Sequence, residues 1–238
     1  MTESLLLSLG ERGPFSEEEF NDWYDNEHIP NLLSLPGYTA AQRYIQNDTR
    51  KPTYLTLYNY TSNSSNPVSS QTNAFNTPEM INYAANLSER EKRIISNVPY
   101  INRRIYKPIF QLPSSSRITR SAAKYLFTVE ADLKDASPEF EEEFNKWCNT
   151  THIPCLSKTE GWVSSRRFQL ELYEELGADA PLPEHAATKY ISIHEFDSSD
   201  YREDQGLMAA VRGEGAQKMA DSKVKFDLRH FVLHKDFY

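Results

Sequence analysis

The chain contains an internal duplication. The segment from Glu17 to Pro30 reads EEEFNDWYDNEHIP, and residues 141–154 read EEEFNKWCNTTHIP. When the comparison is extended without gaps to residues 17–44 and 141–168, 12 of 28 positions are identical, among them Trp23 with Trp147, His28 with His152 and Arg43 with Arg167. A match of this length predicts two copies of one structural unit, so the rest of the chain is interpreted as two halves.

Composition limits the class of partner. The 238 residues are 39% hydrophobic and 25% charged, which is typical of a globular protein with a substantial core. A net charge of −8 without a basic cluster argues against nucleic acid and against an anionic membrane as partners. The first residues lack the basic start and the apolar length of a signal peptide. We therefore expect a cytoplasmic protein in which Cys148 and Cys155 are free thiols.

Periodicity and turn signals predict the order strand, helix, strand, strand, helix, strand in the first half. Ser16 and the three glutamates after it predict a helix start, Pro30 predicts a bend, and Pro36 with Gly37 predicts the helix end. The predicted elements are a strand at 4–9, a helix at 17–36, strands at 38–46 and 54–60, a helix at 77–95 and a strand at 100–110. In the strand at 54–60 tyrosines alternate with leucines. We expect the leucine face to pack under the helices and the tyrosine face to line an amphipathic space.

The second half repeats this order. It predicts a strand at 124–130, a helix at 137–159, strands at 162–170 and 190–196, a helix at 200–220 and a strand at 225–234. Residues 171–185 form an acidic insertion that is predicted to be a loop, and so a candidate lid or partner contact. The shared order is that of a split β-α-β unit. The predicted fold class is therefore α+β, with ferredoxin-like βαββαβ repeats at 1–113 and 122–238 and a linker at 114–121.

The motif from Trp23 to Tyr44, WYDNEHIPNLLSLPGYTAAQRY, resembles the EthD-like branch of the dimeric α/β barrel superfamily. Through the repeat the similarity extends to both halves. The resemblance implies two sheets that face each other to close a barrel, here within one polypeptide. The superfamily includes cofactor-free lyases, cyclases, decarboxylases and monooxygenases, haem enzymes and proteins with no known reaction. The resemblance therefore implies the fold more strongly than the reaction.

His28 is the first candidate for a catalytic residue, because the ordinary pKa of imidazole suits proton transfer near neutral pH. Asp25, three residues earlier, would orient the ring on a regular helix. Glu27 shares a helix face with Trp23 and would act as an acid if a cavity raised its pKa. The alternative is structural, since a histidine before Ile-Pro at a helix break can bond to a backbone carbonyl and fix the turn.

The predicted substrate-binding residues are aromatic, basic or imidazole side chains: Trp23, Tyr24, Arg43, Tyr54, Tyr58, His152 and His194. Tyr54 and Tyr58 would hold a phenolic or enolic oxygen, or would simply fill the barrel. Arg43 would clamp a carboxylate or an enolate, as would Arg167, or each would pair with the acidic helix. Trp23 also lies at the spacing of a core residue.

The two copies differ where chemistry needs polar groups. Tyr24, Asp25 and Glu27 correspond to Cys148, Asn149 and Thr151. We therefore favour a site in the first copy, although the sequence does not decide which repeat holds the pocket. A metal is not predicted, because the spacing of His194, His230 and His234 matches no strong ligand pattern. No cofactor is predicted either, since the chain lacks a glycine-rich phosphate loop.

These features lead to the hypothesis of a cofactor-independent lyase or isomerase that acts on a small aromatic or polyketide-like compound. The reaction would be a decarboxylation, dehydration or cyclisation through an enol or enolate, with His28 moving the proton. The alternatives are a non-catalytic protein that binds a small molecule and a cofactor-free monooxygenase. The expected partner is a small-molecule substrate. A homodimer is compatible with the sequence but not required, because the duplicated chain supplies its own barrel partner.

Overall fold

The computed structural model describes residues 2–62, 73–113, 122–180, 186–213, 217 and 221–238. The chain divides into two compact units. Unit 1 comprises residues 1–107, 170–187 and 234–238, and unit 2 comprises residues 108–169 and 188–233. The linker predicted at 114–121 lies outside the described residues.

The elements follow the predicted types in both halves. The first half contains β1 (Thr2–Gly10), α1 (Glu17–Trp23), a π-helical turn (Tyr24–His28), α2 (Ile29–Leu33), β2 (Tyr38–Gln46), β3 (Tyr54–Ser62), α3 (Pro78–Ala85), α4 (Glu89–Asn97) and β4 (Ile101–Leu112). The second contains β5 (Tyr125–Leu133), α5 (Pro138–Trp147), a π-helical turn (Cys148–His152), α6 (Ile153–Leu156), β6 (Trp162–Leu176), β7 (Tyr190–Phe196), a 3-10 turn (Ser199–Glu203), α7 (Gln205–Arg212) and β8 (Lys223–Phe237).

The strands follow the order β4-β1-β3-β2 in the first half and β8-β5-β7-β6 in the second. The pairs β1/β3, β1/β4 and β2/β3 are antiparallel, as are β5/β7, β5/β8 and β6/β7. The mixed helix and strand architecture confirms the α+β class. No helix among the described residues is both long and apolar enough to cross a membrane.

The repeated motif folds in the same way in both copies. In the first, Ser16 caps α1 by accepting a hydrogen bond from the Glu19 amide (3.0 Å). The helix then widens into a π-helical turn that ends at His28, where the Ile29 amide donates to the Tyr24 carbonyl. A proline cannot donate to the carbonyl four residues earlier and its ring crowds that carbonyl, so Pro30 accounts for the irregular turn before it. The second copy repeats the turn at Cys148–His152.

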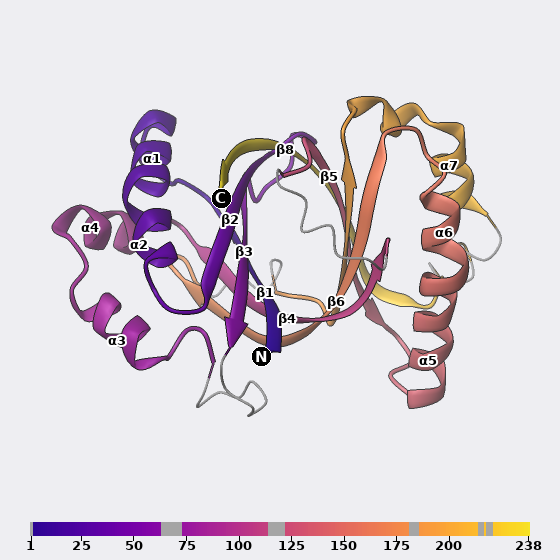
Figure 1. Cartoon of the computed structure of the whole chain (residues 1–238), viewed down its shortest axis with the longest axis horizontal. Helices are drawn as coiled ribbons and strands as arrows, with labels where there is room; N and C mark the ends of the chain where they lie inside the picture. Colours follow the sequence, from indigo (N-terminus) through magenta and orange to yellow (C-terminus); the bar gives the residue numbers. More distant parts are fainter. Residues whose placement is uncertain (1, 63–72, 114–121, 181–185, 214–216, 218–220) are drawn as a thin grey trace. The chain divides into compact units, whose positions relative to one another are not determined.

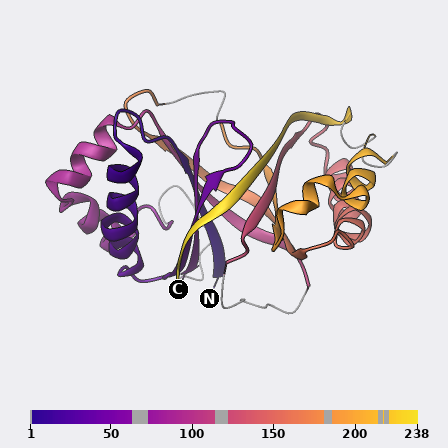
Figure 2. The same cartoon turned by 90° about the horizontal axis from the view of Figure 1, so that it is seen from above.

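The helices of unit 1 cover one face of its strands. Figure 1 shows α1 and α2 along β2 and β3, and Figure 2 shows α3 and α4 beside them. Trp23, Phe20 and Ile29 are at most 1% exposed and form the centre of this layer. Ion pairs from Arg90 and Arg93 hold α4 against α1.

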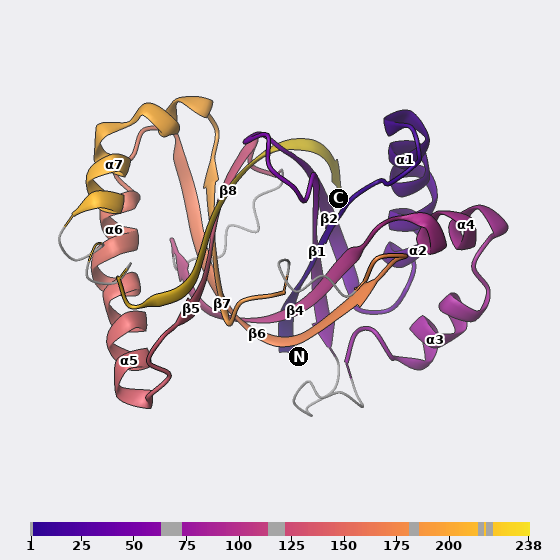
Figure 3. The ribbon, with the colours of Figure 1, turned by 180° about the vertical axis from the view of Figure 1, so that it is seen from behind.

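In unit 2, α5, α6 and α7 cover the corresponding face of β5, β6 and β7 (Figure 3). Phe144 packs on Tyr190 with 5.6 Å between the ring centroids. Phe196 stacks on Tyr201 at 4.1 Å, which joins the sheet to the 3-10 turn before α7. The helices of unit 2 thus lie over β6 and β7, which correspond to β2 and β3 of unit 1.

The expected facing of β3 is wrong. The tyrosine side of this strand packs under the helices, with 4.7 Å between the ring centroids of Tyr54 and Phe20. Leu55 and Leu57 point to the other face of the sheet and pair in register with Leu9 and Leu7 of β1. Strand alternation was predicted correctly, but both faces are buried, so the more apolar face did not identify the helix side. The candidate site lies between helices and sheet.

Three predicted spans also need correction. The helix expected at 77–95 is divided into α3 and α4, because Ser88 caps the second helix by accepting from the Glu91 amide (3.0 Å). The insertion at 171–185 continues β6 as far as Leu176, and its next residues bond to the backbone of Val98 and Pro99. The helix expected at 200–220 begins as a 3-10 turn and continues as α7 to Arg212. Residues 181–185, 214–216 and 218–220 lie outside the described part.

Candidate functional site

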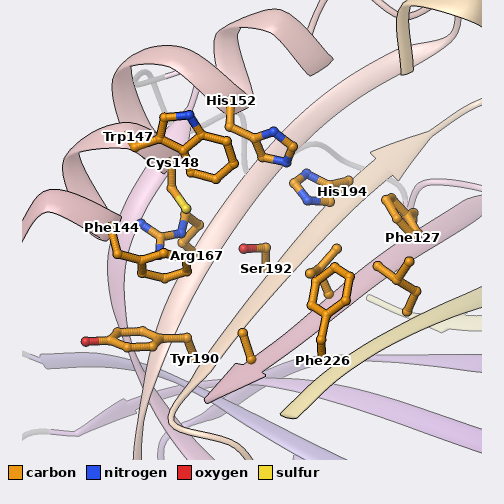
Figure 4. A pocket seen from close by; sticks show the side chains of 13 residues that line it. Phe127, Phe144, Trp147, Cys148, His152, Arg167, Tyr190, Ser192, His194 and Phe226 are labelled. Carbon is orange, nitrogen blue, oxygen red and sulfur yellow. The ribbon is translucent and has the colours of Figure 1, made fainter. Parts of the chain in front are cut away.

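A pocket lies in unit 2 between the helix layer and the sheet (Figure 4). Its volume is about 60 Å³, which is small beside the roughly 300–1,000 Å³ of typical ligand pockets. Phe226, which is 41% exposed, extends the lining to the surface. The apolar lining residues are Phe127, Val129, Ala131, Phe144, Trp147, Phe226 and Leu228, and the others are Cys148, His152, Arg167, Tyr190, Ser192 and His194.

Arg167 is the charged group of the pocket. It extends from β6 to the helix layer, where Nη1 donates to Asn149 Oδ1 (2.7 Å) and Nη2 donates to Asn145 Oδ1 (2.9 Å). The guanidinium also lies against the rings of Phe144 and Tyr190. Burial lowers the pKa of Arg167, yet an arginine remains charged in proteins. Within the described ranges, no carboxylate pairs with it and its Nε has no partner. Amide oxygens solvate this buried charge without neutralising it.

The matching arginine of unit 1 is neutralised. Arg43 Nη1 bonds to Asp25, and Nη2 donates to Asn21 Oδ1 (2.9 Å). His234 Nε2 lies 2.9 Å from the second oxygen of Asp25. Burial would raise the pKa of Asp25, but the hydrogen bonds from His234 and Arg43 outweigh it and lower that pKa. The structure therefore shows the alternative in which Arg43 pairs with the acidic helical segment.

His194 lies on β7 in the pocket wall and is 1% exposed. Its Nδ1 is 2.8 Å from Ser165 Oγ. Burial, reinforced by the nearby His152 and Arg167, lowers the pKa of His194 to about 3. The ring is therefore neutral at physiological pH, and each nitrogen can take part in one hydrogen bond.

His152 ends the π-helical turn and faces His194 across the pocket (Figure 4). Its ring stacks on Trp147 with 4.7 Å between the ring centroids and an interplanar angle of 19°. The structure thus brings together two histidines that the sequence analysis proposed as substrate-binding residues. An imidazole beside a buried cation and a neutral second imidazole is suited to proton transfer.

Tyrosines occupy the corresponding space in unit 1. Tyr24 stands where unit 2 has Cys148, and Tyr58 stands where it has His194. Burial, reinforced by the adjacent Tyr24, raises the pKa of Tyr58 well above its usual value. The four aromatic residues proposed for substrate binding, Trp23, Tyr24, Tyr54 and Tyr58, all belong to the hydrophobic core of unit 1.

His28 bonds to a residue that the sequence analysis did not identify. Its Nδ1 lies 2.5 Å from Glu91 Oε1, and the Tyr83 hydroxyl donates to the same oxygen (2.6 Å). Burial would raise the pKa of Glu91, but its hydrogen bonds with His28 and Tyr83 lower it. The ring also packs on Trp23 at a centroid distance of 5.0 Å. His28 thus connects the π-helical turn to α3 and α4.

The predicted helpers of His28 have other partners. Asp25 is held in the ion pair with Arg43, and Glu27 accepts a hydrogen bond from Ser88 Oγ. The expectation that Asp25 orients His28 is wrong, because the π-helical turn departs from the regular spacing that would have aligned them. Glu91 takes that position instead.

The three histidines considered as metal ligands also have different partners. His230 Nδ1 lies 2.8 Å from the Tyr201 hydroxyl, while His194 bonds to Ser165 and His234 bonds to Asp25. Each ring is therefore engaged in its own contact.

Glu91 and Ser165 were not predicted from the sequence. The signal for Glu91 was its position three residues after Ser88, which is the spacing of a capping box, although its side chain turns to His28 instead of back to the helix start. The signal for Ser165 was the repeat alignment, which places it opposite Ala41 of the first copy. A hydroxyl in place of a methyl group on a buried strand indicates a specific hydrogen bond.

Residues 12–85, which include the first copy of the repeated motif, match a known protein family. The matching family is that of the EthD domain, to which this segment is similar. No curated protein matches the chain in sequence. The EthD match covers the first copy of the motif, with α1, β2, β3 and α3.

Solved structures with a similar fold cover nearly the whole chain. One, an anthrone oxidase-like protein, has a TM-score of 0.61 at 11% identity, over 99% of this chain and 92% of the other. A candidate monooxygenase from Fusobacterium nucleatum subsp. nucleatum has a TM-score of 0.57 at 10% identity, over 99% and 94%. A chlorite dismutase variant from Candidatus Nitrospira defluvii has a TM-score of 0.52 at 8% identity, over 98% and 92%. At these identities the similarities show a shared fold.

Proposed function

We propose that the pocket of unit 2 catalyses proton-transfer chemistry as a cofactor-independent lyase or isomerase. The observation that carries this proposal is the buried Arg167, which has no carboxylate partner in the described part of the chain and lies beside two imidazoles and aromatic walls. A buried cation without a counter-ion favours a ligand that carries or develops negative charge. An enolate on a small aromatic or polyketide-like compound meets this requirement.

His152 would act as the base. It would take a proton from a carbon next to a carbonyl, and the electron pair of that C–H bond would move onto the carbonyl oxygen. Arg167 would stabilise the negative oxygen, since a donor placed where charge develops lowers the free energy of the transition state more than that of the ground state. The enolate would then take the proton from His152 at another carbon, or expel a hydroxide that takes this proton and leaves as water, or attack a second carbonyl whose oxygen takes this proton as the ring closes.

Decarboxylation would use the same anion stabilisation. In a β-keto acid the electrons of the bond to the departing carboxylate move onto the ketone oxygen as carbon dioxide leaves, and the enolate then takes a proton from His152 in its protonated form. Each of these reactions needs the same three elements: a proton carrier, a cation and a site shielded from bulk water.

Proton exchange tests the proposal before the natural substrate is known. We expect the protein to accelerate exchange of the α-protons of 2-tetralone with solvent deuterium, followed by NMR. His152→Gln should lower this rate by about 100-fold, the size of a general-base contribution. The matched variant His28→Gln in unit 1 should keep it. Loss of exchange in His28→Gln with retention in His152→Gln would instead place the site in the first copy, with His28 as the proton carrier.

A cofactor-free monooxygenase is a second candidate. Similar folds carry the names anthrone oxidase-like protein and candidate monooxygenase, and an enolate held in this pocket could react with molecular oxygen. Oxygen consumption with a phenolic ketone would distinguish this reaction from simple exchange. A non-catalytic binding protein would retain the same compound without exchange or oxygen uptake.

We also propose that residues 1–113 and 122–238 are two ferredoxin-like repeats within one chain. Support comes from the matched registers, in which Ala41 pairs with Tyr58 on β2 and β3, and Ser165 pairs with His194 on β6 and β7. Both pairs of strands also shift register near their starts. Further assembly into a homodimer would be visible as a doubled mass in sedimentation velocity.

A further inference from the structure

A short hydrogen-bonded chain ends on His194. The indole Nε1 of Trp162 donates to Ser165 Oγ (2.9 Å), and Ser165 Oγ lies 2.8 Å from His194 Nδ1. Ser165 and His194 face each other as a cross-strand pair on β6 and β7. Both side chains are buried, with 0% and 1% exposure.

The donors and acceptors in this series of hydrogen bonds determine which nitrogen of His194 carries the proton. An indole N–H is only a donor, so Ser165 accepts from Trp162. The single serine proton is then available for His194 Nδ1. If Nδ1 carried a proton instead, the serine hydroxyl would accept twice, and its own proton would have no acceptor among the described residues. A buried unsatisfied donor costs free energy. His194 Nδ1 is therefore the acceptor, and Nε2 carries the proton.

Resting on the proposed function, we propose that Trp162 and Ser165 are positioning residues that fix His194 as the neutral Nε2–H tautomer, a hydrogen-bond donor for a ligand oxygen in the pocket. The ligand would present a carbonyl, enolate or phenolate oxygen to His194 and Arg167. His194 would thus share the developing charge with Arg167, while His152 moves the proton.

The neutral state of His194 agrees with its surroundings. His152 on the facing turn and Arg167 on the adjacent strand both disfavour a second positive charge, and Phe127 on β5 contacts the ring from the apolar side. A neutral imidazole donor gives a hydrogen bond to an anionic oxygen without giving up its proton. This division separates the roles of the two histidines.

The first copy lacks all three residues of this hydrogen-bonded series. Tyr38, Ala41 and Tyr58 stand at the positions of Trp162, Ser165 and His194. Tyr38 and Tyr58 pack edge to face with centroids 6.0 Å apart. Three matched differences in one contact indicate that the chain belongs to the pocket and not to the shared fold.

The tautomer can be measured directly on the full-length protein. Long-range 1H–15N correlation on 15N-labelled protein at neutral pH should show His194 with a protonated Nε2 and an unprotonated Nδ1, the signals being assigned by their loss in His194→Gln. A protonated Nδ1 in the wild-type protein would overturn the proposal, whatever the activity of the enzyme.

A binding experiment tests the consequence for ligands. Ser165→Ala should weaken the affinity for 4-nitrophenolate by about tenfold and change the His194 signals, while Ala41→Ser in unit 1 should leave both unchanged. Unchanged affinity and unchanged His194 signals in a folded Ser165→Ala protein would contradict the positioning role. The correct tautomer without α-proton exchange on 2-tetralone would reject the proposed catalysis but leave the tautomer assignment in place.

Discussion

The two copies of the motif place the same helix, π-helical turn and strands around two different interiors. In unit 1 the space under the turn is filled by Tyr24 and Tyr58, and the buried arginine is neutralised by Asp25. In unit 2 the smaller Cys148 leaves a pocket, and its arginine has only amide partners in the described part of the chain. The shared helix, turn and strands determine where the side chains meet. Side-chain volume and counter-charge then decide whether that place is a core or a pocket.

The largest effect should come from making the second interior like the first. The double variant Cys148→Tyr and His194→Tyr should lower exchange on 2-tetralone by at least about 100-fold, because it fills the pocket and removes an imidazole. Thermal unfolding should remain cooperative, since unit 1 shows that this frame accepts two tyrosines. Tyr24→Phe in unit 1 is the control and should keep full exchange. Retained exchange in the double variant would show that the pocket is not the site.

The next largest effect should come from restoring the missing counter-charge. Asn149→Asp places a carboxylate beside Arg167, as Asp25 lies beside Arg43. We expect the affinity for 4-nitrophenolate to fall about tenfold to 100-fold, because one charged hydrogen bond to the ligand is replaced by an internal pair. Absorbance titration measures this directly. Thr150→Asp adds the same charge at an exposed neighbouring position, and an equal loss there would mean that only the overall field matters.

The reverse change in unit 1 should affect stability and not binding. Asp25→Asn leaves the buried Arg43 without its carboxylate, which should cost about 1–3 kcal/mol in the free energy of unfolding at pH 7. The pKa of Asp25 is lowered in the folded protein. The stability that this carboxylate contributes is therefore complete above its ordinary pKa, and it is lost as the pH falls through the lowered value. Urea unfolding of both proteins at neutral and acid pH should show the difference shrinking, and a constant difference would contradict this account.

The smallest effects should come from features that the two copies share. Ser16 and Ser137 each cap the first helix of their copy by accepting an amide hydrogen bond. Changing either to Ala should cost about 1 kcal/mol and leave exchange on 2-tetralone unchanged. A selective loss of exchange in Ser137→Ala would show that the start of α5, and not only its end, shapes the pocket.

Many of the helices and strands could be predicted from the sequence, because caps and turn residues nearby in the sequence determine where they begin and end. The cap at Ser16 and the end of the helical segment before Gly37 depend on residues close together in the chain, and the duplication repeats them. Gly37 adopts a φ of +94°, and a β-carbon there would lie 2.6 Å from the Tyr60 ring, so the glycine is required at this turn.

The interiors could not be predicted in the same way, because they depend on contacts between distant residues. Glu91 reaches His28 across 63 positions of sequence, and no local pattern links them. The sequence also favoured the first copy, because its polar residues looked chemically richer. In folded unit 1 the polar groups pair with one another, as Asp25 does with Arg43. In unit 2 the matching side chains leave Arg167 without a carboxylate in the described part of the chain, and they leave the pocket beside it.

The most direct test of the account is a crystal structure of the protein soaked with 4-nitrophenol. We expect density in the pocket of unit 2, with the phenolic oxygen within hydrogen-bond distance of Arg167 and of His194 Nε2. Density beside His28 in unit 1, with the pocket of unit 2 lacking the compound, would contradict it.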